Sequence, residues 1–161
     1  MLVNVVVAQN NDAFDIARKG NLLDIEKLYS ADASIVNAVD KNGSSMLILA
    51  CYRSNMPVAT FLMNKNANVN YVSKNGTALM ACVVKNNIEL FDLLISKGAN
   101  PDLVDDNGMT ALMLAVQFNN EGMVKKLLDV KSNKLIKCKL NKTAFEYAIV
   151  TENEKIINLL K

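Results

Sequence analysis

Acidic side chains at short spacing are the usual ligands of calcium, and one such cluster lies in the second half of the chain. The cluster consists of Asp102, Asp105 and Asp106. If the following Gly108 were the central glycine of a calcium-binding loop, the first and last ligands would be Leu103 and Leu114. Neither leucine has a side-chain oxygen, so the calcium pattern fails. Two interpretations of the acidic turn stay open: a solvated turn, or part of a surface that contacts a partner.

The side chains that most often perform catalysis are scarce in this sequence. Histidine is absent, which removes the commonest general acid and base near neutral pH and the commonest metal ligand. The sequence contains no phosphate loop, no dinucleotide-binding fingerprint and no serine nucleophile motif. We therefore predict a protein that is not an enzyme and that holds no cofactor and no metal.

Three cysteines are the remaining reactive groups: Cys51, Cys82 and Cys138. An odd number cannot pair completely, and the spacing matches neither a disulfide framework nor a zinc motif. Cys82 falls on a small-residue position and is predicted to be a buried, inert thiol. Cys138 lies in a predicted turn between Lys137 and Lys139, so a regulatory thiol there stays open beside an inert one.

The composition limits the size of the fold and the kinds of partner. The chain has 161 residues, is 51% apolar, and carries 18 Lys and Arg against 16 Asp and Glu, for a formal net charge of +2. That length suits one domain or one short repeat stack. The near balance of charge gives no bulk reason to expect nucleic acid or an anionic membrane as partner. No apolar window is long enough for a membrane-spanning helix.

Residues 1–11 begin with an uncharged apolar run from Met1 to Ala8. Two interpretations stay open: a hydrophobic extension that packs over the first structural unit, or the remnant of a signal peptide, although no basic region precedes the run. The first interpretation places the protein in the cytoplasm, and the second places it outside, exported or periplasmic.

An internal repeat organises the rest of the chain. Four segments share a hydroxyl residue, a large apolar residue two positions later and a small residue three positions further on. The triplets are Ser45, Leu47 and Ala50; Thr77, Leu79 and Cys82; Thr110, Leu112 and Ala115; and Thr143, Phe145 and Ala148. The steps between copies are 32, 33 and 33 residues. A register kept over four copies predicts a repeat architecture.

Each position of the repeat has a physical role. The hydroxyl accepts a hydrogen bond from the free N–H groups of a first helical turn, so it marks a helix start. The large residue enters the core, and the small residue lets a neighbouring helix approach. Turn dipeptides such as Asn42-Gly43 stand just before these helices. A second apolar stripe at helical spacing follows each first helix, for example Leu90, Phe91 and Leu94.

A period of 33 with turn, helix, turn, helix, and a Gly-x-Thr-Ala-Leu-x-x-Ala core, resembles the ankyrin repeat. The resemblance covers residues 12–161. It implies an all-α solenoid of about five helix-turn-helix repeats joined by β-turn or hairpin loops. The expected repeats are residues 12–39, 40–72, 73–104, 105–137 and 138–161. The rich use of Lys and Asn resembles the bacterial members of the family.

The chain departs from the family pattern at one position. A histidine commonly follows the large apolar residue in ankyrin repeats and supplies polar bonding between repeats. The residues that stand there in this chain are Ile48, Met80, Met113 and Glu146. The fold is expected to persist without that bonding, because it depends on stacked apolar faces.

The resemblance also implies a function. Ankyrin repeats are non-catalytic modules that bind another protein, as scaffold or inhibitor, through their turn tips and the concave face of their first helices. The implied partner is therefore a protein and not a nucleic acid, and the chain is expected to be monomeric. The alternative is a structural or self-associating element that uses Met1 to Ala8, which sedimentation with and without residues 1–8 would reveal.

The family's binding positions can be placed on this sequence one by one. They are Lys41, Asn42, Ser44, Tyr52, Arg53, Lys74, Asn75, Val84, Lys85, Asp106, Asn107, Met109, Gln117 and Phe118. Tyr52 and Phe118 stand out because aromatic side chains are frequent anchors of protein interfaces. The alternative is that they are two isolated exposed aromatics of no special role. Met109 is the methionine expected at the surface.

Overall fold

Residues 13–161 are described by the computed structural model, and they form five successive helix pairs. The first pair is a helix over residues 13–19 and α2 (Leu22–Ala31), followed by the short 3-10 helix η1 (Ala33–Asn37). The other pairs are α3 (Met46–Tyr52) with α4 (Met56–Asn64), α5 (Ala78–Lys85) with α6 (Ile88–Ser96), α7 (Ala111–Gln117) with α8 (Glu121–Asp129), and α9 (Ala144–Thr151) with α10 (Glu154–Leu160).

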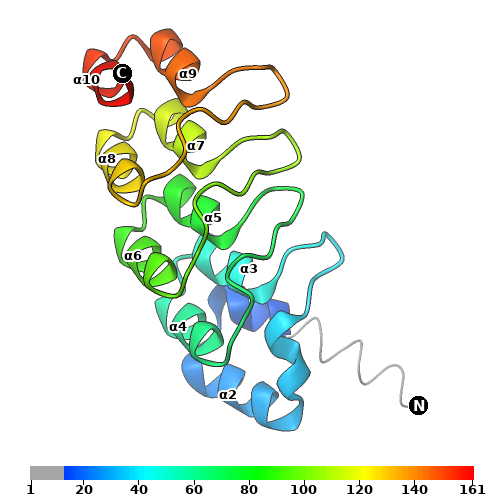
Figure 1. The fold of residues 1–161 in the computed structure, drawn as a ribbon. Helices are drawn as coiled ribbons and strands as arrows, with labels where there is room; N and C mark the ends of the chain where they lie inside the picture. The colour runs from blue at the N-terminus through cyan, green and yellow to red at the C-terminus, as the bar shows by residue number, and fades with distance from the viewer. Residues whose placement is uncertain (1–12) are drawn as a thin grey trace.

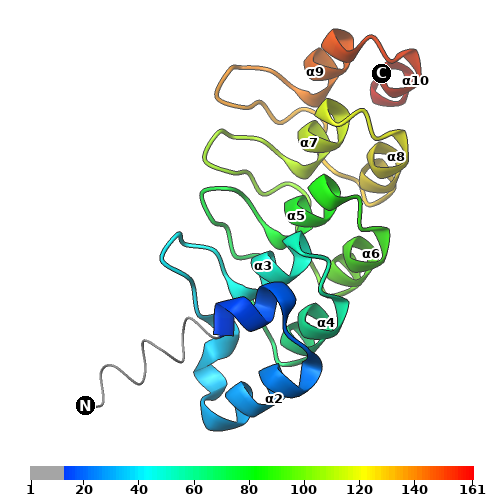
Figure 2. The same ribbon diagram turned by 180° about the vertical axis from the view of Figure 1, so that it is seen from behind.

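The helices stack in two columns. Figure 1 shows α3, α5, α7 and α9 in an inner column and α4, α6, α8 and α10 in an outer column, with long loops projecting from the inner side. Figure 2 shows the same order from behind. Each inner helix packs against its own outer helix and against the next inner helix along the chain. The predicted all-α repeat stack is confirmed.

Hydroxyl residues begin the inner helices, as predicted. Ser45, Thr77, Thr110 and Thr143 are the N-cap residues of α3, α5, α7 and α9, and each side chain accepts a hydrogen bond from the backbone N–H three residues later. Such a side chain satisfies a donor that the first helical turn leaves free. In the last repeat, Glu146 completes a capping box with Thr143.

Asparagine begins each outer helix from α4 onward, a regularity that the sequence interpretation missed. Asn55, Asn87, Asn120 and Asn153 are the N-cap residues, and each side-chain oxygen accepts from a backbone N–H of the first turn. From the second repeat onward, a side chain therefore caps the start of both helices: a hydroxyl caps the inner helix and an amide caps the outer helix.

The stack buries one continuous apolar core. The small-residue positions are fully buried: Ala50, Cys82, Ala115 and Ala148. The large positions Leu47, Leu79 and Leu112 are buried too, whereas Phe145 in the last repeat is only partly buried. Burial at these positions depends on the repeat that follows, which is how a repeat stack stabilises itself. Five methionines are core residues, as expected: Met46, Met63, Met80, Met113 and Met123.

Two of the projecting loops are tight hairpins closed by an aspartate, and in the third repeat Ser73 takes its place and accepts from the N–H of Asn75. One carboxylate oxygen of Asp40 accepts from the backbone N–H groups of Asn42 and Ser44, both at 2.9 Å. Gly43 between them has a φ of +78°, which glycine adopts without steric cost. The hairpin that starts at Asp105 repeats this pattern. Within residues 13–161 these hairpins form isolated bridges and no regular strand.

The hairpins of the third, fourth and fifth repeats are joined by their backbones. The N–H of Asp106 donates to the carbonyl of Lys74 at 3.2 Å, and the N–H of Lys139 donates to the carbonyl of Asn107 at 2.9 Å. These bonds stack one hairpin on the next, so the surface that the hairpins form is continuous across repeats.

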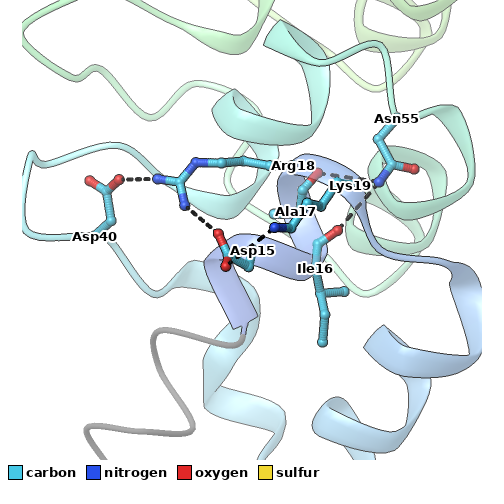
Figure 3. A network of polar contacts seen from close by, with 7 residues as sticks. All are labelled: Asp15, Ile16, Ala17, Arg18, Lys19, Asp40 and Asn55. Carbon is cyan, nitrogen blue, oxygen red and sulfur yellow. Dashed lines mark hydrogen bonds and ion pairs between the residues drawn. The ribbon is translucent and has the colours of Figure 1, made fainter.

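The first helix is tied to the second repeat by polar contacts (Figure 3). Arg18 donates to Asp40 at 2.9 Å and to Asp15 at 3.4 Å. The side-chain amide of Asn55 donates to three backbone carbonyls near the end of the first helix, those of Ile16, Ala17 and Gly20. Asn55, the N-cap residue of α4, thereby supplies a hydrogen-bond donor to the carbonyls at the carboxyl-terminal end of the first helix.

Two further predictions concern residues 1–11 and the absence of a membrane-spanning helix. The interpretations of residues 1–11, as packed extension or signal remnant, lie outside the described residues. Within residues 13–161, none of the helices has the length and apolar character needed to cross a membrane.

Candidate functional site

The hairpins and the inner helices enclose a hollow of about 340 Å³. It lies between the second and third repeats, and its floor is apolar. Its walls are formed by Ser44, Ile48, Leu49, Tyr52, Asn75, Thr77, Met80, Ala81, Val84 and Leu114. Pockets of this size that are mostly apolar, with a few polar groups at the edge, are typical binding sites. We call it the first hollow.

Tyr52 stands at the mouth of the first hollow with 47% of its surface exposed. The ammonium group of Lys85 lies 5.0 Å from the centre of the Tyr52 ring. This distance is that of a cation–π contact, which orients the exposed aromatic side chain. Arg53, the residue after Tyr52, is exposed as predicted.

A second hollow of about 390 Å³ continues along the same side of the stack. It is lined by Asp105, Asn107, Met109, Leu114, Gln117, Cys138, Lys139, Leu140 and Tyr147. Leu114 lines both hollows, so the two are neighbours on one surface. Phe118, next to Gln117 in the sequence, is 56% exposed. We call the two hollows together with the hairpin tips the inner surface.

Most predicted binding positions are exposed on the inner surface. The exposed ones are Lys41, Asn42, Tyr52, Arg53, Lys74, Asn75, Lys85, Asp106, Asn107, Gln117 and Phe118, while Val84 is half-buried. The sequence interpretation missed the floor of the first hollow, chiefly Ile48, Leu49 and Leu114. Leu49, Ala81 and Leu114 occupy the same position of three successive repeats, four residues after the hydroxyl that starts each inner helix.

Two predicted surface residues are buried, so these two predictions were wrong. Ser44 and Met109 are each only 7% exposed. Both follow the glycine of a hairpin, and the aspartate at the hairpin's start holds their backbone N–H. Met109 lies between its own hairpin and the next one, beside Cys138. Hairpin stacking covers the position, and the turn pattern alone does not reveal that.

The acidic turn does not assemble a metal site. Asp105 accepts two backbone N–H groups of its own hairpin, and Asp102 accepts from the N–H of Asn133 at 2.8 Å. In the described part of the chain, no group of three or more His, Cys, Asp or Glu side chains is arranged to hold a metal ion. The carboxylates of Asp102 and Asp105 therefore accept hydrogen bonds from backbone N–H groups.

A larger hollow, of about 570 Å³, lies at the N-terminal end of the described chain, between the first helix and α2. None of the predicted binding positions lines it. Its acidic residue Asp15 already contacts Arg18 and Lys19. Volume alone favours this hollow, but the exposed Tyr52 lines the first hollow, so the inner surface is the better candidate.

The three cysteines lie in different environments. Cys51 and Cys82 are fully buried, and the contact with Cys82, together with burial, raises the pKa of the Cys51 thiol. Cys138 lines the second hollow, with its sulfur 3.2 Å from the Tyr147 hydroxyl. Burial acts to raise the pKa of Cys138, but hydrogen bonds from Tyr147 and from nearby backbone N–H groups outweigh it, so this pKa lies below its ordinary value.

We expect Cys138 to be the cysteine that iodoacetamide alkylates first in the folded protein, because the thiolate is the reactive form. Since its pKa is lowered, its alkylation rate should rise with pH at a lower midpoint than that of a free thiol. Tyr147→Phe removes the hydroxyl donor and should move this midpoint to higher pH. Mass spectrometry of peptides sampled over time gives the rate for each cysteine. Faster labelling of Cys51 or Cys82, or an unchanged midpoint in Tyr147→Phe, would contradict the geometry.

The sequence was compared with models of known protein families. A model described as ankyrin repeats (3 copies) matches residues 13–105 and residues 79–161. The two matches overlap and together span residues 13–161, which is the whole described part of the chain. The helix pairs, hairpins and caps seen in the structure thus coincide with a known repeat pattern.

Proposed function

The chain belongs to the ankyrin-repeat family, and from that premise we propose that it is a non-catalytic module that binds another protein through its inner surface. Ankyrin repeats generally mediate interactions between proteins, and the family is typically non-catalytic. The module would act as a scaffold, or as an inhibitor that covers a functional surface of its partner.

The observation that carries the proposal is the placement of exposed aromatic side chains beside apolar hollows. Tyr52 and Phe118 are both about half exposed, and both stand at the ends of inner helices. Aromatic residues contribute most to binding where neighbouring contacts can exclude water from them. Tyr52 lines the first hollow, and Gln117, the residue before Phe118, lines the second. A partner's side chain that enters either hollow can exclude that water.

Rigidity of the inner surface supports the same function. Two hairpins are closed by aspartate side chains, and the hairpins of the third, fourth and fifth repeats are bonded to one another by their backbones. The inner helices are capped and packed on both sides. A preformed surface loses little conformational entropy on binding, so more of the contact energy appears as affinity.

The test is a pull-down from the source cell with the native protein and the Tyr52→Ala, Phe118→Ala double variant. The matched control is Ile88→Ala, Leu135→Ala, which removes two exposed apolar side chains elsewhere. Circular dichroism first establishes that all three proteins are equally folded. We expect a protein partner that the native and control proteins retain and the double variant loses, with affinity at least about tenfold weaker, since two anchors each contribute about 1 kcal/mol or more.

Two other outcomes would change the proposed binding surface or refute the proposed function. A partner lost only by the control variant would place the binding surface on the outer helices or loops. Sedimentation that shows self-association, abolished by deleting residues 1–8, with no other protein retained, would favour the structural alternative.

A further inference from the structure

The first hollow is flanked by positive charges. Lys41 and Lys74 stand at the tips of two successive hairpins, and Arg53 and Lys85 end the inner helices α3 and α5. All four are exposed, and none forms an ion pair within residues 13–161. Lys85 reaches the mouth of the hollow itself, since its ammonium lies over the Tyr52 ring.

Arg53, Lys74 and Lys85 have no carboxylate paired with them within residues 13–161, whereas Lys41 lines a separate hollow together with Asp15 and Asp40. Among the described residues that line the first hollow, none is acidic. Asp40, the nearest acid in the hairpins, is bonded to Arg18 and to two backbone N–H groups. The next hairpin carries the exposed acid Asp106 in the place of Lys41 and Lys74, so the positive region is confined to the second and third repeats.

Some of the cations on the outer surface form ion pairs. There Lys126 contacts Asp92 at 2.8 Å, and Lys125 contacts Glu121 at 2.8 Å. Lys27 and Lys97 also form no ion pair within residues 13–161, so the cations of the first hollow differ from them in their place beside an apolar pocket whose described lining has no acidic residue. Local unpaired charge beside an apolar pocket favours partners of opposite charge, because like charges are repelled during the encounter.

From this arrangement we propose that the first hollow binds an acidic peptide segment in which a large apolar side chain is flanked by Asp or Glu. The apolar side chain enters between Ile48, Met80 and Leu114, which line the hollow. The flanking carboxylates face Arg53, Lys74 and Lys85, which adjoin Tyr52, Asn75 and Val84 of the lining. The Asn75 side chain at the rim offers a donor and an acceptor to the peptide backbone. This inference rests on the proposed function and specifies the chemistry of its partner.

A single-stranded nucleic acid would also be attracted by the cations. It binds by stacking bases on open aromatic faces. Here one face of the Tyr52 ring is covered by Lys85, and Tyr52 is the single aromatic among the described residues that line the hollow. The geometry therefore favours a peptide, and the oligonucleotide becomes an outcome of the test.

The experiment selects peptides from a random 12-residue library on the full chain and measures the selected peptides by fluorescence anisotropy. We expect them to carry a large apolar residue beside Asp or Glu, and to bind several-fold more weakly at about 300 mM than at about 50 mM salt, because screening weakens exposed charge contacts. Lys74→Glu, Lys85→Glu should weaken binding at least about tenfold. The control Lys27→Glu, Lys97→Glu makes the same change of net charge elsewhere and should leave binding within about twofold.

The outcomes separate this inference from the function on which it rests. Selected peptides that are neutral or basic would overturn the inference of an acidic partner, and so would peptides whose binding both charge-reversal variants weaken equally. If the Tyr52→Ala, Phe118→Ala variant still loses these peptides, the proposed binding function stands. Peptides unaffected by that variant, or none selected at all, would count against both. Tighter binding of a single-stranded oligonucleotide than of any selected peptide would also overturn the inference.

Discussion

Val116→Asp is expected to destabilise the protein by more than about 4 kcal/mol, a large part of the free energy of unfolding of a typical domain. Val116 is fully buried on α7, in a position that the next repeat covers. A carboxylate placed there has neither water nor a cation, and burial of an unpaired charge is among the costliest changes in a core. Urea unfolding followed by circular dichroism measures the loss.

Ile149→Asp is the matched control, because Ile149 occupies the same position of the last described inner helix. It is 50% exposed, since the described chain places no further repeat over it. The same chemical change at the same helical turn should therefore cost less than about 1 kcal/mol. Equal losses in the two variants would mean that burial by the following repeat does not stabilise this stack.

Asn55→Asp is expected to cost about 2–4 kcal/mol, because one isosteric change removes three hydrogen bonds. The Asn55 amide donates to the carbonyls of Ile16, Ala17 and Gly20 at 3.3, 3.3 and 3.0 Å. A carboxylate keeps the acceptor that caps α4 but turns a second oxygen towards these carbonyls. The first helix pair should detach before the rest, which hydrogen exchange of residues 13–31 would detect as early loss of protection.

Asn87→Asp provides the comparison for Asn55→Asp. Asn87 caps α6 by accepting from the N–H of Leu90 at 3.0 Å, and within residues 13–161 its amide group donates no hydrogen bond to another residue. Aspartate is as good a cap as asparagine and interacts favourably with the helix dipole. The change should alter stability by less than about 0.5 kcal/mol. A large loss here would show that the cap, rather than the three carbonyl contacts, explains the effect at Asn55.

The helix starts and the core could be predicted from the sequence because each depends on local rules. A hydroxyl residue ahead of an apolar stripe was enough to locate α3, α5, α7 and α9. The small residues of the repeat are buried as predicted, since only they leave room for a neighbouring helix. Tyr52 and Phe118 are exposed for the same reason: their positions face away from the core.

Features that arise between repeats could not be predicted in this way. Met109 is buried where hairpins are stacked by backbone bonds, and no side-chain pattern records those bonds. The contact between Asn55 and the first helix joins residues more than thirty positions apart. Nor does spacing alone reveal a hollow, because its floor is made of side chains from three helices.

Other residues take the place of the histidine that is common in the family, and other side chains supply polar bonds between repeats. Three of the residues in its place are buried and apolar: Ile48, Met80 and Met113. Polar bonding between repeats occurs instead at asparagines, where Asn120 donates to Asn86 at 2.8 Å and Asn153 donates to Asn119 at 2.6 Å. Amide pairs at the ends of the inner helices thus join neighbouring repeats, in addition to the backbone bonds between hairpins.

Site-specific photo-crosslinking tests most directly whether the inner surface binds the partner. The photoreactive residue benzoylphenylalanine is placed at Tyr52 or Phe118, and at Ile88 or Leu135 as exposed controls away from the two hollows. Irradiation in extract of the source cell should give a discrete protein adduct from the first two positions and none from the controls. Adducts from Ile88 or Leu135 alone would contradict the account, because they would place the partner away from the inner surface.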